Sequence, residues 1–163
     1  PLHHVGAVLD SRGFHPGLTG YQNLRVLASM GGMPGSRVDE VLAQVELSDA
    51  RNKRVKGYSL GMKQRLSLAA ALLGDPDVLI LDEPANGLDP AGIAWLRGFI
   101  AEQAHAGKTV LVSSHQLAEL QNVVDDVIII NRGKLVASGT LEEITGGQTL
   151  EEAFLRLTSG VTS

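Results

Sequence analysis

The second half of the chain alternates short apolar runs with longer amphipathic stretches. Residues 78–81 predict a strand buried on both faces, followed by a helix from about 90 to 105, and residues 109–112 predict the next strand. The apolar runs 127–130 and 135–137 are separated by an Arg-Gly pair, which is typical of a β-hairpin. Strands that alternate with helices predict a parallel sheet with helical cover, closed by a small antiparallel element.

The first half has a different spacing of apolar residues, which predicts mostly helix between about residues 19 and 74. A short apolar run at 5–9 predicts a strand, and the Gly- and Pro-rich residues 11–19 predict a loop. Helices are expected from Thr19 or Gly20 onward, over the region around 38–47, and from Ser59 up to Gly74 as a C-cap. The simplest organisation is therefore a helical insertion in an α/β core.

Composition narrows the class of protein without identifying it. The chain has 163 residues, of which 44% are hydrophobic and 20% charged, which suits one globular domain. The net charge of −4 gives no reason to expect a nucleic-acid partner, because proteins that bind nucleic acids usually present a basic face. There is no cysteine, which excludes a disulfide framework or a thiolate metal site. No apolar run approaches the roughly 20 residues that span a bilayer.

Two adjacent carboxylates, Asp82 and Glu83, close the apolar run at 78–81, and Pro84 ends it. Side chains at the C-terminal ends of parallel strands lie where such sheets bind ligands. Because neighbouring strand residues point in opposite directions, one carboxylate can reach a Mg²⁺ ion while the other faces an attacking water. Taken alone, the pair could equally be a strand end without function.

Three segments have distinctive patterns: residues 79–84 (Leu-Ile-Leu-Asp-Glu-Pro), residues 87–90 (Gly-Leu-Asp-Pro) and residues 58–65 (Tyr-Ser-Leu-Gly-Met-Lys-Gln-Arg). The first resembles the Walker B motif of the ATP-binding cassette (ABC) ATPases, and the second resembles the D-loop that follows it. The third resembles the signature motif of this family. The resemblance implies a partial P-loop NTPase (RecA-like) core of α/β class with an inserted α-helical signature subdomain.

The resemblance also implies roles for individual residues, with ATP and Mg²⁺ as cofactors. Asp82 would assist Mg²⁺ coordination, and Glu83 would be the general base that polarises the hydrolytic water. Ser59 and Gly61 would bind the γ-phosphate of ATP held by a partner subunit, where a helix N-terminus favours phosphate. Asp89 would communicate with the opposite site across the dimer.

The signature segment departs from the family's Leu-Ser-Gly-Gly-Gln pattern at two positions. Leu60 stands in place of the first Gly, and Met62 in place of the Gln. We expect Leu60 to narrow the close approach of backbone to phosphate, and Met62 to lose a polar contact. Taken in isolation, this segment would be interpreted as the start of an ordinary helix with Ser59 as its N-cap.

His115 and Asp10 are further candidates. His115 follows the strand at 109–112, where the family places a switch histidine that contacts the γ-phosphate; a lone histidine there would more often be a loop residue. Asp10 ends the first strand, where the family normally has a glutamine that touches Mg²⁺. Asp10 could ligate Mg²⁺ directly, as hard cations favour carboxylates, or could have no role.

The chain contains no Gly-x-x-x-x-Gly-Lys-Ser/Thr sequence. In the family this Walker A loop lies roughly forty residues before the position of Asp10, and so would fall before Pro1. We therefore interpret Pro1 as an internal cut and expect the chain alone to be inactive as an ATPase. The organisation expected is a single ABC ATPase domain, 1–163, lacking its N-terminal portion.

Within that domain, residues 1–18 are expected to form a core strand and a segment like the family's Q-loop, and residues 19–75 the helical signature subdomain. Residues 76–163 would supply the rest of the RecA-like core. The intact polypeptide is expected to be an ATPase that powers transport, in the manner of bacterial drug and peptide exporters. Its partners would be transmembrane permease domains and a second ATPase domain in a head-to-tail dimer, at the cytoplasmic face of a bacterial membrane. A non-transport ABC ATPase, or an inactive ABC-like interaction module, is the alternative.

Overall fold

The computed structural model describes residues 4–9 and 13–159, and the chain divides into two compact units after Ser113. We call them the core unit, which ends at Ser113, and the C-terminal unit, which begins at Ser114, and describe each by itself. Within the described residues, none of the helices has the length and apolar character that crossing a membrane requires.

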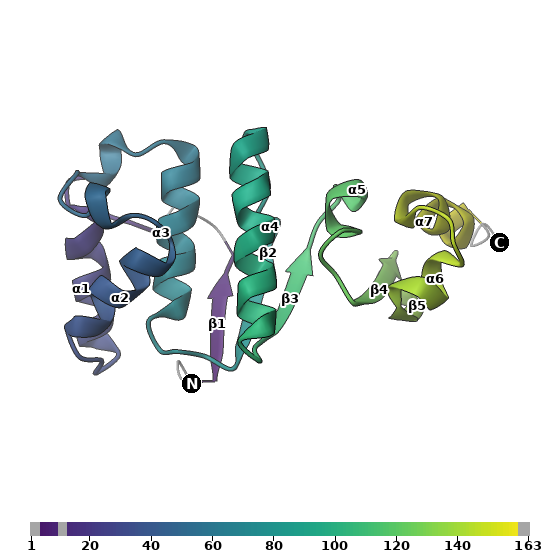
Figure 1. Cartoon of the computed structure of the whole chain (residues 1–163), viewed down its shortest axis with the longest axis horizontal. Coiled ribbons are helices and arrows are strands. Elements are labelled where there is room, and N and C mark those ends of the chain that lie inside the picture. The colour runs from purple at the N-terminus through teal and green to yellow at the C-terminus, as the bar shows by residue number, and fades with distance from the viewer. Residues whose placement is uncertain (1–3, 10–12, 160–163) are drawn as a thin grey trace. The chain divides into compact units, whose positions relative to one another are not determined.

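The core unit is built on three parallel strands in the order β1-β2-β3 (Figure 1). These are β1 (Val5–Val8), β2 (Val78–Asp82) and β3 (Thr109–Ser113). The connection from β1 to β2 holds three α-helices, and the connection from β2 to β3 holds α4 (Pro90–His105). This arrangement confirms the parallel sheet and the helical insertion predicted from the sequence.

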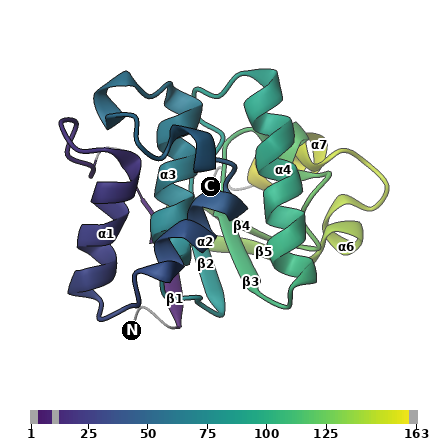
Figure 2. The ribbon, with the colours of Figure 1, turned by 60° about the vertical axis from the view of Figure 1, so that its left-hand side comes forward.

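Helices cover one face of this sheet. Helix α3 packs against β1 and α4 against β3, and both helices lie on the same side of the strands (Figure 2). On that side Leu79 and Leu81 of β2 are fully buried. The residues between them point the other way, so Ile80 is only half-buried, and its β3 neighbour Leu111 is 52% exposed. Among the described residues of the core unit, helices pack on one face of the sheet only, so the expectation that β2 is buried on both faces is not met within this unit.

The helical segment consists of α1 (Gly20–Met30), α2 (Ser36–Gln44) and α3 (Leu60–Leu72), with short 3₁₀ turns at Ser48–Ala50 and Val55–Gly57. Helix α1 begins with a capping box, in which the Thr19 side chain accepts a hydrogen bond from the Gln22 amide and the Gln22 side chain accepts one from the Thr19 amide. The three helices share a core of fully buried aliphatic side chains: Leu24, Val38, Val41, Leu42, Leu66, Leu68 and Leu72.

A glycine brings this helical segment onto the sheet. A Cβ atom at Gly6 of β1 would lie 2.3 Å from the carbonyl oxygen of Ala71 in α3. Glycine in a strand permits such a close approach of another backbone. Any larger residue at this position would therefore force α3 to move away from the strand.

Helix α3 ends differently from the expectation that Gly74 is its C-cap. The helix ends at Leu72, with Leu73 as the C-cap in right-handed conformation, and the left-handed residue is Asp75 at φ 50°. The guanidinium of Arg37 in α2 donates hydrogen bonds to the carbonyls of Leu72 and Leu73, at 3.0 and 3.2 Å. Because Arg37 satisfies carbonyls that the helix end leaves open, a glycine cap is not needed there.

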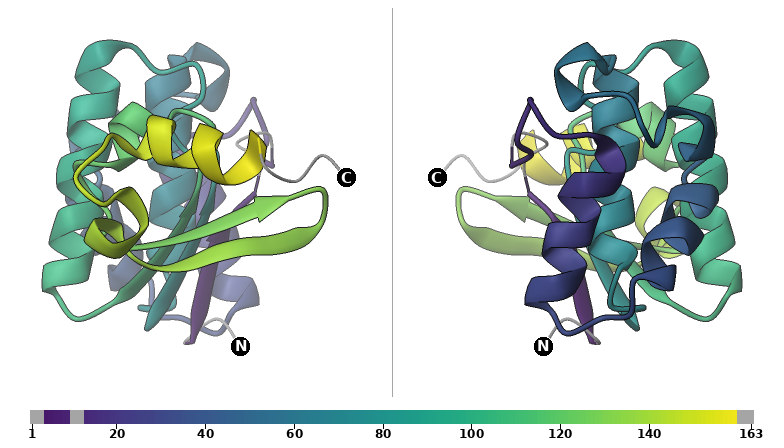
Figure 3. Two further views of the ribbon diagram at one scale, coloured as in Figure 1. Left: turned by 90° about the vertical axis from the view of Figure 1, so that its right-hand side faces the viewer. Right: turned by 90° about the vertical axis from the view of Figure 1, so that its left-hand side faces the viewer.

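The C-terminal unit holds a hairpin with helices packed against it (Figure 3). Its elements are α5 (Leu117–Leu120), β4 (Asp126–Asn131), β5 (Lys134–Thr140), α6 (Leu141–Thr145) and α7 (Leu150–Ser159). Arg132 and Gly133 between the strands are both left-handed, at φ 49° and 74°. Two left-handed residues match the right-handed twist of the flanking strands, and the predicted hairpin is confirmed.

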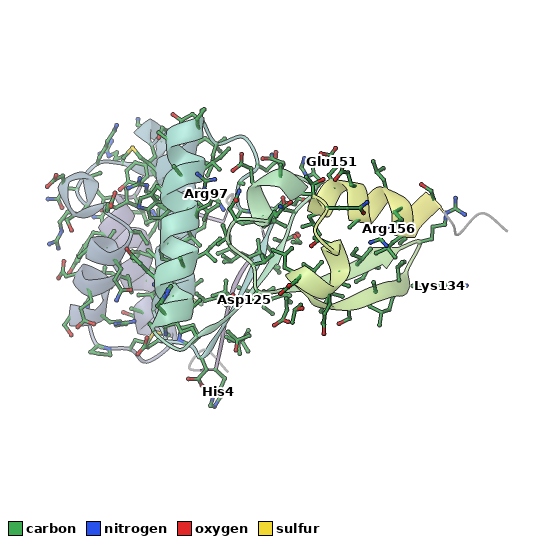
Figure 4. All side chains as sticks on the ribbon, turned by 45° about the vertical axis from the view of Figure 1, so that its right-hand side comes forward. His4, Arg97, Asp125, Lys134, Glu151 and Arg156 are labelled. Carbon is green, nitrogen blue, oxygen red and sulfur yellow. The ribbon has the colours of Figure 1, made fainter. Side chains whose placement is uncertain are left out.

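A small hydrophobic cluster holds this unit together. It consists of Ile129 of β4, Ile144 of α6, and Leu150 and Ala153 of α7. The Arg156 side chain of α7 also donates to the carbonyl of Ile144 at 3.1 Å, and Figure 4 shows it on the same helix as Glu151.

Candidate functional site

The first candidate residue, Asp82, is the last residue of β2. Its partner in the neighbouring strand is Ser113, the last residue of β3. The Ser113 hydroxyl donates a hydrogen bond to Asp82 Oδ1 at 2.5 Å. Asp82 is otherwise exposed, so it presents a carboxylate at the C-terminal edge of the sheet.

Glu83 leaves the sheet immediately after Asp82. Its φ is 47°, an uncommon left-handed value for a residue other than glycine. Its amide donates to the Ser113 carbonyl at 3.2 Å and to the Ser113 hydroxyl at 3.0 Å. The direction of the half-buried Glu83 side chain is thus set by this turn and not by the alternation of a strand.

Ser113 therefore organises both carboxylate residues, and sequence reasoning assigned it no role. Its hydroxyl accepts from the Glu83 amide and donates to the Asp82 carboxylate. The sequence did offer one signal, because the strand that follows the Asp-Glu pair ends in a residue with a hydroxyl group. The parallel register that places it beside Asp82 was not visible from the sequence.

The chain after Glu83 forms a tight turn that leads into α4. The Asn86 amide donates to the Glu83 carbonyl, and the Leu88 amide to the Ala85 carbonyl, both at 3.1 Å. Asp89 is the N-cap of α4: its carboxylate accepts from the Gly92 amide at 2.8 Å. Asp89 thus has a structural task within its own chain, and a role across a dimer stays a prediction.

Ser59 is the N-cap of α3, as its position in the sequence predicts. Its hydroxyl accepts from the Met62 amide at 3.2 Å. The first amides of the helix, those of Leu60 and Gly61, have no carbonyl partner within it, so they point outward at its positive end. Met62 contributes its backbone to this cap, whereas its side chain is half-buried.

The fold brings the signature segment and the D-loop segment together. A Cβ atom at Gly87 would lie 2.8 Å from a methyl carbon of Leu60, and one at Gly61 would lie 3.9 Å from a methyl carbon of Leu88. Within the core unit, two segments that are about 27 residues apart in the chain thus touch, as insertions in an α/β core permit.

His115 and Asp10 are the remaining candidates. His115 is exposed near the start of the C-terminal unit, after Ser114, whose hydroxyl accepts from the Gln116 amide at 2.9 Å. Its role as a switch histidine stays a prediction. Asp10 lies outside the described residues, so both readings of it stand as they were.

The donor atoms near Asp82 suit a hard cation that is bound only partly by protein. No group of three or more His, Cys, Asp or Glu side chains able to hold a metal occurs among residues 4–9 and 13–159. The Asp82 carboxylate and the Ser113 hydroxyl supply oxygen alone. Mg²⁺ commonly uses one or two carboxylates together with phosphate oxygens and water, so this donor set fits Mg²⁺.

The fold and the motifs together define an ABC-type nucleotide-binding domain. Residues 1–86 match the family described as ABC transporter, and the chain belongs to that family. Its architecture is a partial P-loop NTPase core, similar to a solved structure described as the ATP-binding subunit of an ABC transporter. The TM-score is 0.82 and the sequence identity 28%, over 96% of this chain and 69% of that one.

Curated relatives place the chain more closely within this family. It is 43% identical over 142 residues to the bacitracin transport ATP-binding protein of Enterococcus faecalis, which covers 86% of this chain and 46% of the relative. It is 38% identical over 153 residues to a lantibiotic transport ATP-binding protein of Streptococcus pyogenes, covering 94% of this chain and 66% of the relative. The chain thus spans about half to two thirds of the length of these relatives.

A second solved structure shares the fold. It is the cbiO1 protein of Clostridium perfringens, described as part of the ABC transporter complex cbiONQ, with a TM-score of 0.79 and 26% identity over 98% of this chain and 64% of that one.

Proposed function

We propose that the full-length protein containing this chain hydrolyses ATP to power an ABC transporter. The observation that carries the proposal is the Asp82–Glu83 pair. It is tied to Ser113 at the C-terminal edge of a parallel sheet, in a chain that belongs to the ABC family. Such edges are where open α/β sheets bind their ligands.

Glu83 is the proposed general base. Its backbone is held by two hydrogen bonds to Ser113, which fixes the point from which the carboxylate starts. A carboxylate positioned within hydrogen-bond reach of a water can take up its proton as the water attacks the γ-phosphate. Asp82, with Ser113, would hold Mg²⁺, which neutralises charge on the phosphate oxygens when it is bound.

The N-terminus of α3 is the proposed contact to a second nucleotide. Ser59 and the amides of Leu60 and Gly61 lie at the positive end of a thirteen-residue helix, which favours a phosphate group. We propose that this phosphate belongs to ATP on a second ATPase domain, arranged head to tail, and that Asp89 faces that domain.

The transported compound is proposed from the relatives. Those named for bacitracin and lantibiotic transport support an antibiotic of that kind as the substrate and outward movement as the direction. We propose membrane-spanning permease domains as the partners and the cytoplasmic face of a bacterial membrane as the location of this protein.

The test is ATP turnover by the full-length protein, with Glu83→Gln as the diagnostic variant. We expect turnover to fall at least about 100-fold while ATP binding persists, because the amide cannot take up the proton. Glu102→Gln, on the exposed surface of α4, is the matched control and should hydrolyse normally.

Two results would count against this function. If Glu83→Gln turns over ATP like the wild-type protein, Glu83 is not the base. If the wild-type protein binds ATP without any turnover, the proposed ATPase function is wrong and the alternative of an inactive ABC-like interaction module is favoured.

A further inference from the structure

Leu60 and Gly87 fit each other closely although they belong to different motifs. Leu60 is the first residue of α3 and is 47% exposed, and its methyl carbon lies over Gly87. Gly87 has a φ of 73°, and a Cβ there would come within 2.8 Å of that methyl. A side chain at position 87 is thus excluded both by backbone conformation and by the space that Leu60 occupies.

The next residues along both segments continue the contact. Gly61 lies 3.9 Å, measured from an added Cβ, from a methyl carbon of Leu88. Leu88 in turn lies against Gly92 in the first turn of α4, where an added Cβ would be 3.3 Å from the Leu88 Cβ. Leu88 is therefore wedged between the N-termini of α3 and α4, whose caps are Ser59 and Asp89.

A second level of contact holds the same two helices further along. The guanidinium of Arg65 in α3 lies 4.0 Å from the centre of the Trp95 ring in α4. Arg65 also pairs with Glu46, at 2.6 Å, and its side chain is only 23% exposed. A partly desolvated cation over a tryptophan face is a favourable contact, so α3 and α4 are joined at two points.

We propose that Leu60 is a positioning residue that holds the D-loop turn against the signature helix. Gly87 belongs to the turn that starts at Glu83, whose carbonyl accepts from the Asn86 amide. Through this turn Leu60 keeps the outward-pointing amides of α3 and the carboxylate of Glu83 in one rigid piece. The leucine, turned onto Gly87 of its own chain, is thus a link between two motifs.

The first experiment measures amide hydrogen exchange at Leu88, whose amide donates to the Ala85 carbonyl, in the full-length protein. Leu60→Ala removes the methyl groups that reach Gly87, and we expect exchange at Leu88 to quicken about tenfold, since local opening becomes easier. Leu60→Met, which can still reach Gly87, should keep near wild-type protection. Leu155→Ala, a similarly exposed leucine in α7, is the matched control.

The second experiment, which rests on the proposed function, measures ATP hydrolysis by the same variants. Leu60→Ala should lower kcat about tenfold and leave KM for ATP within about twofold, because the base is mispositioned while ATP still binds. Leu60→Met should restore kcat.

The two readouts separate the two proposals. Unchanged exchange at Leu88 in Leu60→Ala, or equal exchange in the Ala and Met variants, overturns the role of Leu60 whether or not the protein hydrolyses ATP. A rise in KM with kcat intact also overturns it, because Leu60 would then act on phosphate approach. If the wild-type protein does not hydrolyse ATP, the proposed function fails and the exchange result alone decides the role of Leu60.

Discussion

Strands β2 and β4 carry nearly the same apolar run and are buried very differently. Leu79 and Leu81 of β2 are fully buried, whereas Ile128 and Ile130 of β4 are 57% and 62% exposed, with Ile129 between them at 4%. Strand β2 lies between two other strands of a sheet covered by helices. Strand β4 pairs with β5 alone and packs one face on α6 and α7.

The difference shows that an apolar run identifies a strand without saying how much of it is buried. Burial depends on how many strands flank the run and how many faces receive a covering layer. In β4 the alternation of buried and exposed isoleucines is that of a one-sided strand, although the residue types do not alternate. The contrast can be tested by removing side chains from each strand in turn.

The largest effect is expected at the centre of β2. Leu79→Ala should lower the free energy of unfolding by about 3 kcal/mol, because it leaves a cavity under a fully buried side chain. Denaturant unfolding followed by Trp95 fluorescence measures it, since this single tryptophan belongs to the core unit. The half-buried Ile80→Ala is the control and should cost clearly less; equal losses would show that both faces of β2 are buried.

A smaller effect is expected at the buried position of β4. Ile129→Ala should destabilise the C-terminal unit by about 2 kcal/mol, because Ile129 belongs to its small cluster. Hydrogen exchange of the hairpin amides measures this locally. Protection that is lost equally in Ile130→Ala would contradict the one-sided packing of β4.

The entry to β2 carries an ion pair that sharpens the contrast further. Lys108, just before β3, donates from Nζ to Asp75 Oδ1 and to the Pro76 carbonyl, both at 2.8 Å. This hydrogen bond from Lys108 is the main cause that lowers the pKa of Asp75, and Arg37 adds to it. Because the pKa of Asp75 is lowered in the folded state, the ion pair stabilises the fold fully at pH values above the ordinary pKa of a carboxyl group. This stabilisation is lost as the pH falls through the lowered pKa.

Asp75→Asn should therefore cost up to about 1 kcal/mol near neutral pH, a small amount because the Asp75 side chain is 70% exposed and screened by water. Asparagine tolerates the left-handed backbone, so the change isolates the charge. Urea unfolding of both proteins near neutral pH and in strong acid measures the difference, which should vanish in acid. A difference that persists in acid would assign the effect to the backbone.

The smallest effect is expected on the open face of β4. Ile130→Thr should change the free energy of unfolding by no more than about 0.5 kcal/mol, since Ile130 is exposed and threonine suits a strand. Thermal unfolding of the two proteins is sufficient to measure it. A loss as large as that of Ile129→Ala would show that something covers this face.

The amino-acid sequence by itself determined the elements and the class. The bounds of α4, the N-cap Ser59 and the hairpin turn were predicted from local chemistry, because capping and turns involve residues within four positions of each other. The segments around the Asp82–Glu83 pair and Ser59 indicated the family through their resemblance to its motifs.

Only the tertiary structure decided which distant residues meet. Ser113 reaches Asp82 through the register of parallel strands, and Leu60 reaches Gly87 through the docking of α3. The Arg37 side chain satisfies the carbonyls at the end of α3, where a glycine cap was expected. The face of each sheet that helices cover determines which aliphatic residues are buried. These contacts depend on crossovers and packing between elements far apart in the chain, and no local pattern of residues encodes them.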